Sequence, residues 1–597
     1  MNKAAIYHRP ESEFAFLSKD NLVNIRLRTA LDDLVQVELY FGDPYDLSTI
    51  SSDNENEDKA IWKHEVAKMG KVASTDTHDY YQVAVKLPHK RMHYLFVLTS
   101  KTGEKFIYTD RGLIDYSDER ISEKYSPFSL PFFHDVDKYK TPEWVKSTVW
   151  YQIFPERFAN GDKSNDPENV KDWEDTEKIG RGDFYGGDLQ GIIDHLDHLT
   201  ELGVNGLYLT PIFKAPSNHK YDTVDYMEID PHFGDKATFK QLVEDCHARG
   251  IKVMLDAVFN HIGDKSLVWQ DVLKNQEKSK YADWFHINNW PVGYEGTKEF
   301  EPNMSRDYET FSYSPHMPKL NTSNPEVEEY LLAVADYWIR EFDIDGWRLD
   351  VANEVDHQFW KKFRRTCDVA KKDFYVVGEV WHSAQTWLNG DEFTAVMNYF
   401  YTDAILDYFV KNKLSMNAMV SQLNQQLMLY RDETNGAMFN ILDSHDTERL
   451  LHACAEDVDL FKQVIAFTYL QPGNPCVYYG DEIGMTGGND PDCRRPMNWD
   501  LENHNPDRFW FFHDLIALRL KNSDLLTMGT MNWQFVSEEK GLIQLKRKLG
   551  NKELTGTFNT GTHTNMIDLQ KIRASNLAKI NGNQIEIAAK GFVISES

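Results

Sequence analysis

The sequence predicts an α/β protein: a closed parallel (β/α)8 barrel, or TIM barrel, with an all-β sandwich domain before it and a small β domain after it. Three observations predict this fold. Eight short apolar runs recur from about residue 143, amphipathic helical patterns separate them, and both ends of the 597-residue chain are strand-rich. Eight parallel strands with intervening helices close into a barrel rather than an open sheet. The 41% apolar residues are enough for a sizeable core.

Residues 1–125 are predicted to form the sandwich. The runs NIRLRT, VQVELYF, YYQVAVKL and HYLFVL are short and apolar or alternating, and turn-rich pieces separate them. Residues 126–142 contain Pro127, Pro131 and Pro142 and are predicted to be a linker, because proline disfavours helices and central strands. Residues 527–597 are predicted to be the small C-terminal β domain.

The barrel is predicted to span 143–526, and four β/α units are clearest. A helix ends at Gly203 before the strand VNGLYL, and another ends near Gly250 before IKVMLDAVF. A helix begins at Pro325 and leads to DIDGWRLDV, and HQFWKKFRRTCDVAKK leads to FYVVGEVW. Further strands are expected at 148–154, 395–400, 437–442 and 474–479. The segment 262–317 is too long for an ordinary connection, so it is predicted to be an excursion over the mouth of the barrel.

Charge and targeting signals narrow the function class. Lys plus Arg number 65 and Asp plus Glu 94, so the net charge is 65 − 94 = −29, which repels nucleic acid and anionic membranes. The N-terminus has no apolar run of the secretory type, and no stretch of about 18 apolar residues could span a membrane. The five cysteines are scattered, without a CxxC pair. We therefore expect a cytoplasmic protein that binds neither nucleic acid nor a membrane.

Acidic residues follow four of the predicted barrel strands. Asp256, Asp350, Glu379 and Asp446 lie at or just past the carboxyl ends of the third, fourth, fifth and seventh strands. That end of a barrel is its catalytic face. One such acid alone is more often a helix cap or turn residue. Four on one rim indicate a functional site, because crowded like charges are costly unless partners or function compensate.

The residues around these acids predict how they ionise. Arg348 lies two residues before Asp350 on the same strand, so both face the same way and the guanidinium is expected to keep Asp350 ionised. Like charge and burial are then expected to raise the pKa of Glu379, so that it keeps a proton to donate. A nucleophile and an acid of this kind serve glycoside hydrolysis. A carboxyl separation of about 5 to 5.5 Å predicts retention, and about 6.5 to 9.5 Å predicts inversion.

Histidine and aromatic side chains complete the predicted rim. His261 and His445 could bind a metal, but no HxH or HExxH spacing occurs, so hydrogen bonding to sugar hydroxyls is favoured. Flat aromatic faces that can stack on sugar rings, or belong to the core, are those of Tyr221, Trp290, Trp347, Trp381 and Trp387. Trp347 is predicted to be a core residue.

Several motifs together resemble one family. DAVFNH (256–261), GWRLDVANE (346–354), GEVW (378–381) and ILDSHD (441–446) resemble the four signature regions of the α-amylase family of retaining glycoside hydrolases. MPKLN (317–321), with IFPERFANGD, SNHKYDTVDY and QPGNPCVYYGDEIGMTGGNDP, resembles the neopullulanase, cyclomaltodextrinase and maltogenic amylase branch. The likeness covers nearly the whole chain. It includes the N-terminal β module, which in that branch is a starch-binding-type domain that helps to form a dimer.

The resemblance implies a role for each matched residue. Asp350 matches the nucleophile, Glu379 the general acid/base and Asp446 the third acid. Residues implied in substrate binding or its support are Tyr221, Asp256, His261, Arg348, Trp381 and His445. Positions implied to hold a structural Ca²⁺ are Asn160, Asp162, Asn165, Asp166, Gly186 and Asp188. Such oxygen ligands suit Ca²⁺, although the run NGDKSND alone fits an ordinary Asx turn equally well. No organic cofactor is expected.

The expected function is a retaining glycoside hydrolase that cleaves α-1,4-glucosidic bonds of cyclodextrins, maltooligosaccharides and pullulan through a covalent intermediate, with an option of transglycosylation. A homodimer formed through the N-terminal domain is expected. The alternatives are a general α-amylase on starch, an α-1,6-glucosidase, and a non-catalytic α-glucan-binding protein. The missing signal peptide disfavours the first, MPKLN disfavours the second, and the intact set of Asp350, Glu379, Asp446 and Arg348 disfavours the third.

Overall fold

The computed structural model describes residues 1–18, 21–50, 59–87, 89–122, 126–293, 299–301, 304–500 and 505–596. They form two compact units: Met1–Lys140 with Leu414–Asn435, and Thr141–Lys413 with Gly436–Ser597. The predicted fold class is confirmed, with a barrel, an N-terminal sandwich, an excursion after the third barrel strand and a C-terminal sheet. Within the described ranges no helix is both long and apolar enough to cross a membrane.

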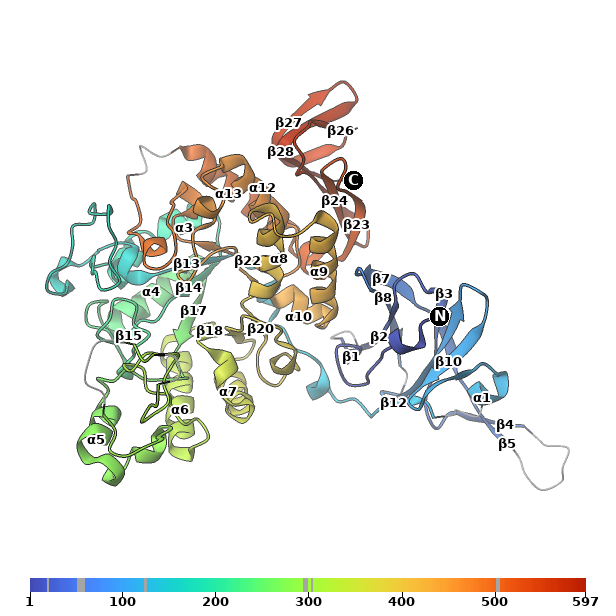
Figure 1. Ribbon diagram of the computed structural model, residues 1–597, viewed down its shortest axis with the longest axis horizontal. Helices are drawn as coiled ribbons and strands as arrows, with labels where there is room; N and C mark the ends of the chain where they lie inside the picture. Colours follow the sequence, from blue (N-terminus) through green and yellow to red (C-terminus); the bar gives the residue numbers. More distant parts are fainter. Residues whose placement is uncertain are drawn as a thin grey trace. The chain divides into compact units, whose positions relative to one another are not determined.

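Eight parallel strands form the barrel, at the places where the sequence predicts them (Figure 1). Sheet order follows chain order, and the isolated parallel bridge between Met397 and Phe439 closes the ring. The predicted run 395–400 contributes only two strand residues, because helix α8 begins at Tyr399. The strands are β13 (Trp150–Ile153), β14 (Gly206–Leu209), β17 (Lys252–Ala257), β18 (Gly346–Leu349), β19 (Tyr375–Gly378), β20 (Ala395–Val396), β21 (Phe439–Asn440) and β22 (Asn474–Tyr478).

Helices surround these strands in the same unit. Pro325 opens α6 as predicted, and Gly203 ends α3 in the left-handed conformation at φ +90°. The helix predicted before Gly203 is divided in two at His195, whose ring Nδ1 lies 2.8 Å from the carbonyl oxygen of Gly191. The helices are α2 (Leu189–Asp194), α3 (Leu196–Leu202), α4 (Lys236–Ala248), α5 (Leu267–Asn275), α6 (Pro325–Phe342), α7 (His357–Ala370), α8 (Tyr399–Phe409), α11 (Leu450–Ala453), α12 (Val458–Tyr469), α13 (Pro506–Lys521) and α14 (Ser523–Met528).

A buried carboxylate stabilises the end of the barrel opposite the acidic rim. Asp345, just before β18, is 2% exposed and accepts hydrogen bonds from Val253 N at 3.0 Å, Lys252 Nζ at 2.9 Å and Lys371 Nζ at 3.0 Å. His247 Nε2 lies 2.7 Å from the same carboxylate. Burial raises the pKa of Asp345, but the His247 hydrogen bond and the lysine charges outweigh it, so the net pKa lies well below its usual range.

Asp345→Asn is expected to lower the free energy of unfolding by about 2 kcal/mol at pH 7, since the hydrogen-bond donors around it lose their buried, negatively charged acceptor. Because the pKa of Asp345 is lower in the native state than in the unfolded state, the ionised carboxylate stabilises the fold at neutral pH. That stabilisation is lost as pH falls below about 4. The gap in Tm between the wild type and this variant, measured by thermal unfolding at pH 7, 5 and 3, is therefore expected to narrow with acid. Asp343→Asn, at an exposed partner of the same Lys371, is the matched control and should change Tm little. A gap that is independent of pH would contradict this account.

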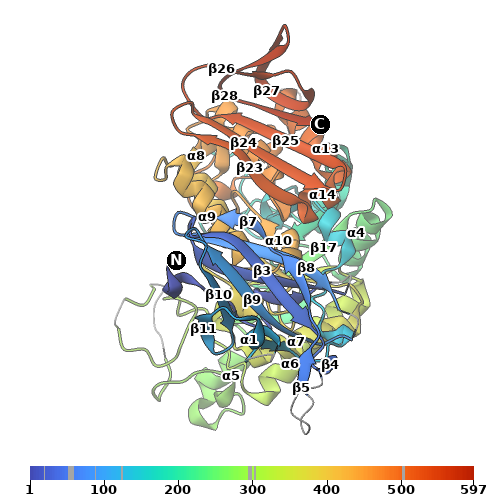
Figure 2. The same ribbon diagram turned by 90° about the vertical axis from the view of Figure 1, so that its right-hand side faces the viewer.

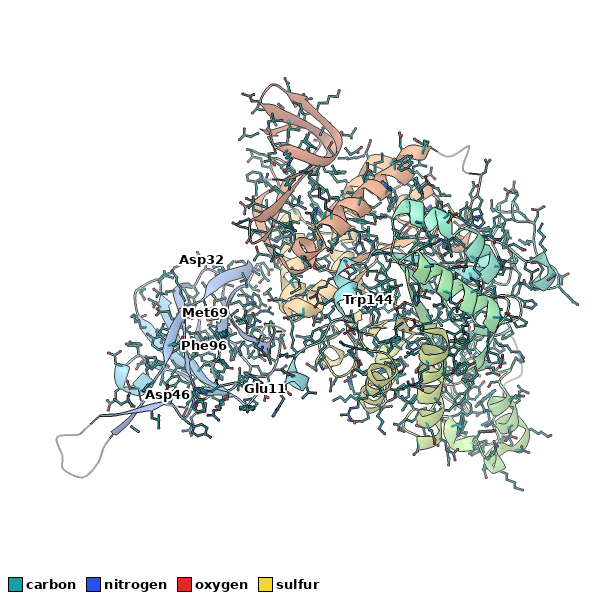
Figure 3. The ribbon with its side chains drawn as sticks, turned by 180° about the vertical axis from the view of Figure 1, so that it is seen from behind. Glu11, Asp32, Asp46, Met69, Phe96 and Trp144 are labelled. Atoms are coloured by element: carbon teal, nitrogen blue, oxygen red, sulfur yellow. The ribbon has the colours of Figure 1, made fainter. Side chains whose placement is uncertain are left out.

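The N-terminal strands pack as a two-layer sandwich. One sheet has the order β1 (Ala15–Leu17), β2 (Leu22–Ala30), β8 (His78–Lys86), β7 (Gly70–Ser74). The other has β11 (Gly112–Asp115), β10 (Lys105–Thr109), β9 (Met92–Ser100), β3 (Leu34–Gly42), β6 (Glu65–Lys68), with β12 (Phe128–Leu130) on β9. Met69 and Phe96 are buried between the layers, and Asp32 and Asp46 lie at the margin (Figure 3). A hairpin of β4 (Leu47–Ile50) and β5 (Lys59–Trp62) and the short helix α1 (Asp118–Ser122) complete this part.

One association was not predicted from the sequence. The segment Leu414–Asn435, which contains α9 (Met416–Met428) and the start of α10 (Asp432–Ala437), belongs to the compact unit of the N-terminal strands. Arg26 of β2 is fully buried and donates hydrogen bonds to the carbonyl oxygens of Met428 at 3.0 Å and Tyr430 at 3.1 Å. It also pairs with Asp432 at 3.1 Å. The predicted domain boundaries at 125, 142 and 526 remain predictions.

The C-terminal residues form one antiparallel sheet (Figure 2). Its strands are β23 (Thr530–Ser537), β24 (Leu542–Leu549), β25 (Lys552–Asn559), β26 (Asn565–Asp568), β27 (Lys571–Asn581) and β28 (Gln584–Glu596). Arg547 of β24 is fully buried and donates to the carbonyl oxygens of Leu470 at 2.6 Å and Gly529 at 3.0 Å. Because these carbonyl groups end α12 and α14, the arginine joins the sheet to the helices of its own unit.

The predicted excursion 262–317 is irregular in its described parts. It contains α5 and a cluster in which Trp269 contacts Phe285 and Tyr308, with ring centroids 4.7 and 4.6 Å apart. An isolated bridge between His261 and Lys319 joins the two ends of the excursion. Residues 294–298 and 302–303 of this segment lie outside the described residues.

Candidate active site

A cavity of about 650 Å³ opens at the carboxyl ends of the barrel strands. Six of the nine predicted catalytic and substrate-binding residues line it: Tyr221, His261, Asp350, Glu379, Trp381 and Asp446. His219, Phe311 and Arg494, which the sequence analysis did not single out, line it as well. A cavity with converging acids and aromatic rings is the ordinary form of a small-molecule site.

Arg348 joins three carboxylates below this cavity. Its guanidinium is fully buried, and Nη1 donates to Asp350 Oδ1 at 2.7 Å and to Asp256 Oδ1 at 3.0 Å. Nη2 lies 3.0 Å from Glu379 Oε1. Strand register explains this arrangement, since Asp256 and Arg348 are paired neighbours on β17 and β18, and Asp350 follows two residues later. The two acids that face the cavity therefore contact the same guanidinium.

The ionisation of this cluster differs from the sequence-based expectation. Burial raises the pKa of Asp350 well above its ordinary value; Arg348 opposes the rise, and Glu379 and Asp256 add to it. Burial likewise raises the pKa of Asp256 to about 6. The expectation that Arg348 lowers the pKa of Asp350 enough to keep it ionised is not met, because the effect of burial, which is the largest, outweighs that of the guanidinium. The environment of both aspartates therefore favours their neutral forms.

Hydrogen bonds from two neighbours orient Glu379. Val351 N donates to Oε2 at 2.9 Å, and the Trp381 indole Nε1 donates to Oε1 at 3.0 Å. Val351 has φ +48°, a left-handed conformation that is rare for a β-branched residue and is found where a site requires it. The Trp381 ring stacks on Tyr399, with centroids 3.7 Å apart. The Glu379 side chain is thus held from both sides.

Three predicted residues, Asp256, Arg348 and His445, do not line the cavity. Asp256 is 1% exposed, and its Oδ2 accepts hydrogen bonds from Tyr208 at 2.7 Å and Tyr221 at 3.0 Å. Asp256 and Arg348 lie deeper because they precede the last residues of β17 and β18, and His445 is fully buried although it follows β21. Their contacts are with the lining residues, so they position the site from beneath.

Both predicted histidines are neutral. Burial lowers the pKa of His261 to about 3 and that of His445 well below its usual value. His445 Nε2 lies 2.6 Å from the Tyr221 hydroxyl, and the two rings stack with an interplanar angle of 2°. His261 Nε2 lies 3.2 Å from the carbonyl oxygen of Tyr221. Both imidazoles therefore hold Tyr221 in place against the cavity.

Two polar residues missed by the sequence analysis complete this arrangement. Arg494 lies 3.3 Å from Asp446 Oδ1 and donates to the carbonyl oxygen of His445 at 2.8 Å. Gln152 Nε2 lies 2.7 Å from His445 Nδ1. Gln152 interrupts an otherwise apolar strand, a signal that was present in the sequence; Arg494 follows no such pattern. Of the remaining aromatic candidates, Trp347 is fully buried, as predicted, and Trp290 and Trp387 do not line the cavity.

The residues predicted to hold Ca²⁺ come together beside the start of α2. Asp188 accepts hydrogen bonds from Gly161 N at 3.1 Å and Asp162 N at 2.8 Å, and Asn160 Nδ2 donates to Asp166 at 2.7 Å. Among the described residues no donor reaches the buried oxygens Asn160 Oδ1 and Asn165 Oδ1. Gly186 has φ +82°, and a Cβ there would collide with Asp166. Two unsatisfied amide oxygens beside carboxylates fit an oxygen-preferring cation such as Ca²⁺.

Comparison with known proteins identifies the family. Residues 152–514 match the model of the α-amylase catalytic domain, and residues 1–134 match that of the α-amylase N-terminal Ig-like domain. The chain belongs to the α-amylase family. It is 47% identical over 580 residues to an intracellular maltogenic amylase of Bacillus subtilis, covering 97% of this chain and 95% of the relative. The family resemblance seen in the sequence is therefore confirmed.

Relatives within the α-amylase family include cyclomaltodextrinases. One from Geobacillus thermopakistaniensis (strain MAS1) is 49% identical over 552 residues, covering 92% of this chain and 90% of the relative. A solved cyclomaltodextrinase structure matches with a TM-score of 0.89 at 41% identity and covers all of both chains. The α-amylase family fold thus extends over the whole chain, and like these named relatives the protein is a glycoside hydrolase.

Proposed function

We propose that this protein hydrolyses α-1,4-glucosidic bonds of cyclodextrins and short maltooligosaccharides, and of pullulan, with retention of anomeric configuration. The observation that supports this most is the placement of Asp350 and Glu379 on one buried guanidinium, with both carboxyl groups facing one cavity. Contact with a single planar group favours the short separation that retaining enzymes use. The names of the relatives support the substrate class.

The proposed reaction has two steps. Glu379 protonates the glycosidic oxygen while an oxygen of Asp350 bonds to the anomeric carbon, and the leaving sugar departs as an alcohol. Glu379, now a carboxylate, then takes a proton from water, whose oxygen displaces Asp350 from the glucosyl ester. A sugar hydroxyl in place of water would give transglycosylation. The first step needs Asp350 as a carboxylate and Glu379 as a carboxylic acid when the glycosidic bond breaks.

The neighbouring residues have supporting roles in this proposal. Asp446 accepts hydrogen bonds from hydroxyls of the distorted sugar, and Arg494 keeps it oriented. Tyr221, held by the neutral imidazoles of His261 and His445, presents its ring to the reacting sugar. Trp381 stacks on the acceptor side and holds the proton donor through its indole nitrogen.

Reducing-sugar release from β-cyclodextrin, pullulan and soluble starch, measured side by side, tests the proposed specificity. Opening of cyclodextrin much faster than cleavage of starch is the expected result. If starch is the better substrate, the protein is a general α-amylase. If none is cut, the protein is a glucan-binding protein.

Removal of Ca²⁺ is expected to destabilise the fold. We propose that Asn160, Asp162, Asn165, Asp166, the Gly186 backbone and Asp188 hold the ion, which would neutralise these carboxylates. A chelator is therefore expected to lower Tm by several degrees, and added Ca²⁺ to restore it, because a ligand that binds only the native state stabilises it. Asn160→Ala is expected to abolish this chelator effect. An equal Tm with and without chelator would overturn the proposal.

We further propose that the enzyme acts in the cytoplasm as a homodimer formed through its N-terminal domain. The word intracellular in the name of one relative supports the location, and the match of residues 1–134 to the α-amylase N-terminal Ig-like domain supports the dimer, because that domain takes part in dimer formation in the branch that the sequence resembles. Sedimentation velocity of the full chain and of a variant lacking residues 1–125 tests the dimer; an unchanged oligomeric state on truncation would contradict it.

A further inference from the structure

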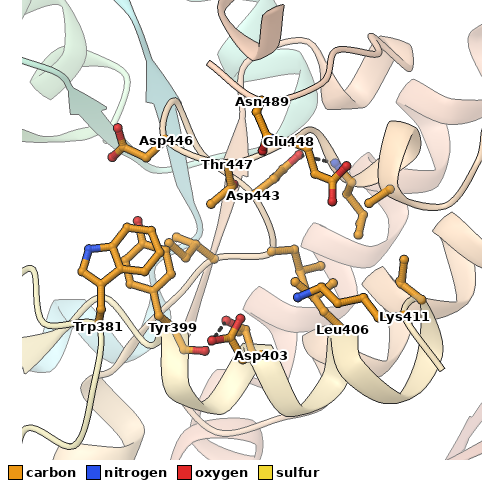
Figure 4. A pocket seen from close by; sticks show the side chains of 16 residues that line it. Trp381, Tyr399, Asp403, Leu406, Lys411, Asp443, Asp446, Thr447, Glu448 and Asn489 are labelled. Atoms are coloured by element: carbon orange, nitrogen blue, oxygen red, sulfur yellow. Dashed lines mark hydrogen bonds between the residues drawn. The ribbon is translucent and has the colours of Figure 1, made fainter. Parts of the chain in front are cut away.

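A second cavity, which we call the side pocket, adjoins the active site. It has a volume of about 290 Å³ and lies between α8 and residues 441–453, with Asn489 at its edge (Figure 4). Trp381 and Asp446 line both this pocket and the active-site cavity. The side pocket therefore meets the active site beside the reacting groups, and the proposed mechanism leaves it without a role.

The side pocket has an apolar floor and polar groups around it. Leu406 and Val410 from one side and Ile441 and Leu450 from the other form the floor. Polar groups at its margin are Asp403, Lys411, Glu448 and Asn489. Such a mixture, apolar surface with a few hydrogen-bonding groups, is typical of sites for small neutral ligands.

Several of these polar groups are available to a ligand. Within the described residues no hydrogen bond or ion pair engages the exposed Asp403 carboxylate. Lys411 Nζ lies 3.2 Å from Asp407 and projects towards Leu406 and Asp403 (Figure 4). An exposed ion pair of this kind contributes little to stability. The ammonium group can therefore donate to a ligand at small cost to the fold.

Two stacked aromatic side chains line the side pocket, and one of them, Trp381, also lines the active-site cavity. The Trp381 indole is 46% exposed and stacks on Tyr399 at an interplanar angle of 9°. Tyr399 is 4% exposed, and its hydroxyl lies on the side of Asp446 (Figure 4). The Trp381 ring therefore offers an aromatic surface at the place where the two cavities share their lining.

We propose that the side pocket binds a glucosyl unit attached as a branch to the glucan in the active-site cavity. A sugar fits because its hydroxyls can pair with Asp403, Lys411 and Asn489 while its apolar face lies against Trp381. The acids at the margin repel phosphate-bearing ligands. The pocket shares Trp381 and Asp446 with the active-site cavity, so an occupant of the pocket can be joined as a lateral branch to the glucan in that cavity. This inference rests on the proposed function.

Equilibrium binding of ligands to a catalytically inactive variant tests the side pocket, because no glycosidic bond is cut during the measurement. In an Asp350→Asn background, calorimetry would measure Kd for 6-O-α-maltosyl-β-cyclodextrin and for β-cyclodextrin. We expect the branched ligand to bind about tenfold more tightly, the effect of one or two hydrogen bonds. Leu406→Trp, which fills the pocket, and Lys411→Met, which removes a donor, should each abolish that advantage and leave Kd for β-cyclodextrin within about twofold.

Lys413→Met is the matched control, since this lysine follows the same helix but does not line the pocket. It should leave both Kd values unchanged. Equal affinity for the two ligands would overturn the side-pocket proposal. So would tighter binding of the branched ligand that survives both Leu406→Trp and Lys411→Met. Hydrolysis of β-cyclodextrin by the wild type would still uphold the proposed function in either case. If the inert protein binds neither ligand and the wild type cuts nothing, the proposed function itself fails.

Discussion

Asp350→Asn is expected to lower kcat on β-cyclodextrin by about 10⁴-fold or more, because the amide cannot form the glucosyl ester. The fold should survive, since the substitution removes one of three carboxylates that compete for the Arg348 guanidinium. Its Tm is therefore expected to equal or exceed that of the wild type, as is common when a strained site is relaxed. Steady-state kinetics and thermal unfolding on the same preparation check both parts.

Two further variants control this prediction. Asp391→Asn changes an exposed aspartate, paired with Lys361, in the same unit, and should leave kcat unaltered. Asp350→Ala excludes activity regained by deamidation of the asparagine. Retention of more than about 1% of wild-type kcat by Asp350→Ala would mean that another group is the nucleophile.

Glu379→Gln is expected to separate the two roles of this residue. Maltotriose, whose leaving group needs a proton, should be turned over about 10³-fold more slowly. α-Glucosyl fluoride needs no proton to form the ester, so the ester should accumulate and only its hydrolysis should be slow. Azide, which attacks without a general base, should then restore turnover and give α-glucosyl azide.

The configuration of that azide is decisive. Two successive displacements give the α product, and a single direct displacement gives the β product. Trp381→Phe, which removes the indole hydrogen bond to Glu379 but keeps an aromatic ring, is the milder companion variant. Equal slowing of maltotriose and the fluoride in Glu379→Gln, without azide rescue, would contradict the assignment of acid/base function.

The barrel could be predicted from sequence because its signals are local. Each strand is a short apolar run, and helix boundaries such as Pro325 and Gly203 are set by single residues with restricted or unusual backbone preferences. The acids at the rim were found because they follow those strands directly. The layer beneath, with Tyr208 and Gln152, required strand register, which shows which polar side chains point into the barrel.

Other features depend on long-range packing that no local pattern encodes. The association of Leu414–Asn435 with the N-terminal strands depends on the buried Arg26, which is more than 400 residues away from Asp432 in sequence. The direction of the Asp350 pKa shift was mispredicted because the argument from Arg348 left out the burial of this carboxyl group, whose effect Glu379 and Asp256 reinforce. Charge counting over a whole cluster needs the three-dimensional arrangement.

The central claim is that Asp350 and Glu379 cleave an α-glucosidic bond by two displacements at one anomeric carbon. Proton NMR during the first minutes of maltotriose hydrolysis, before mutarotation, tests it most directly. The account predicts that the newly released reducing end appears as the α anomer. Initial appearance of the β anomer would show a single displacement and would contradict the proposed role of Asp350.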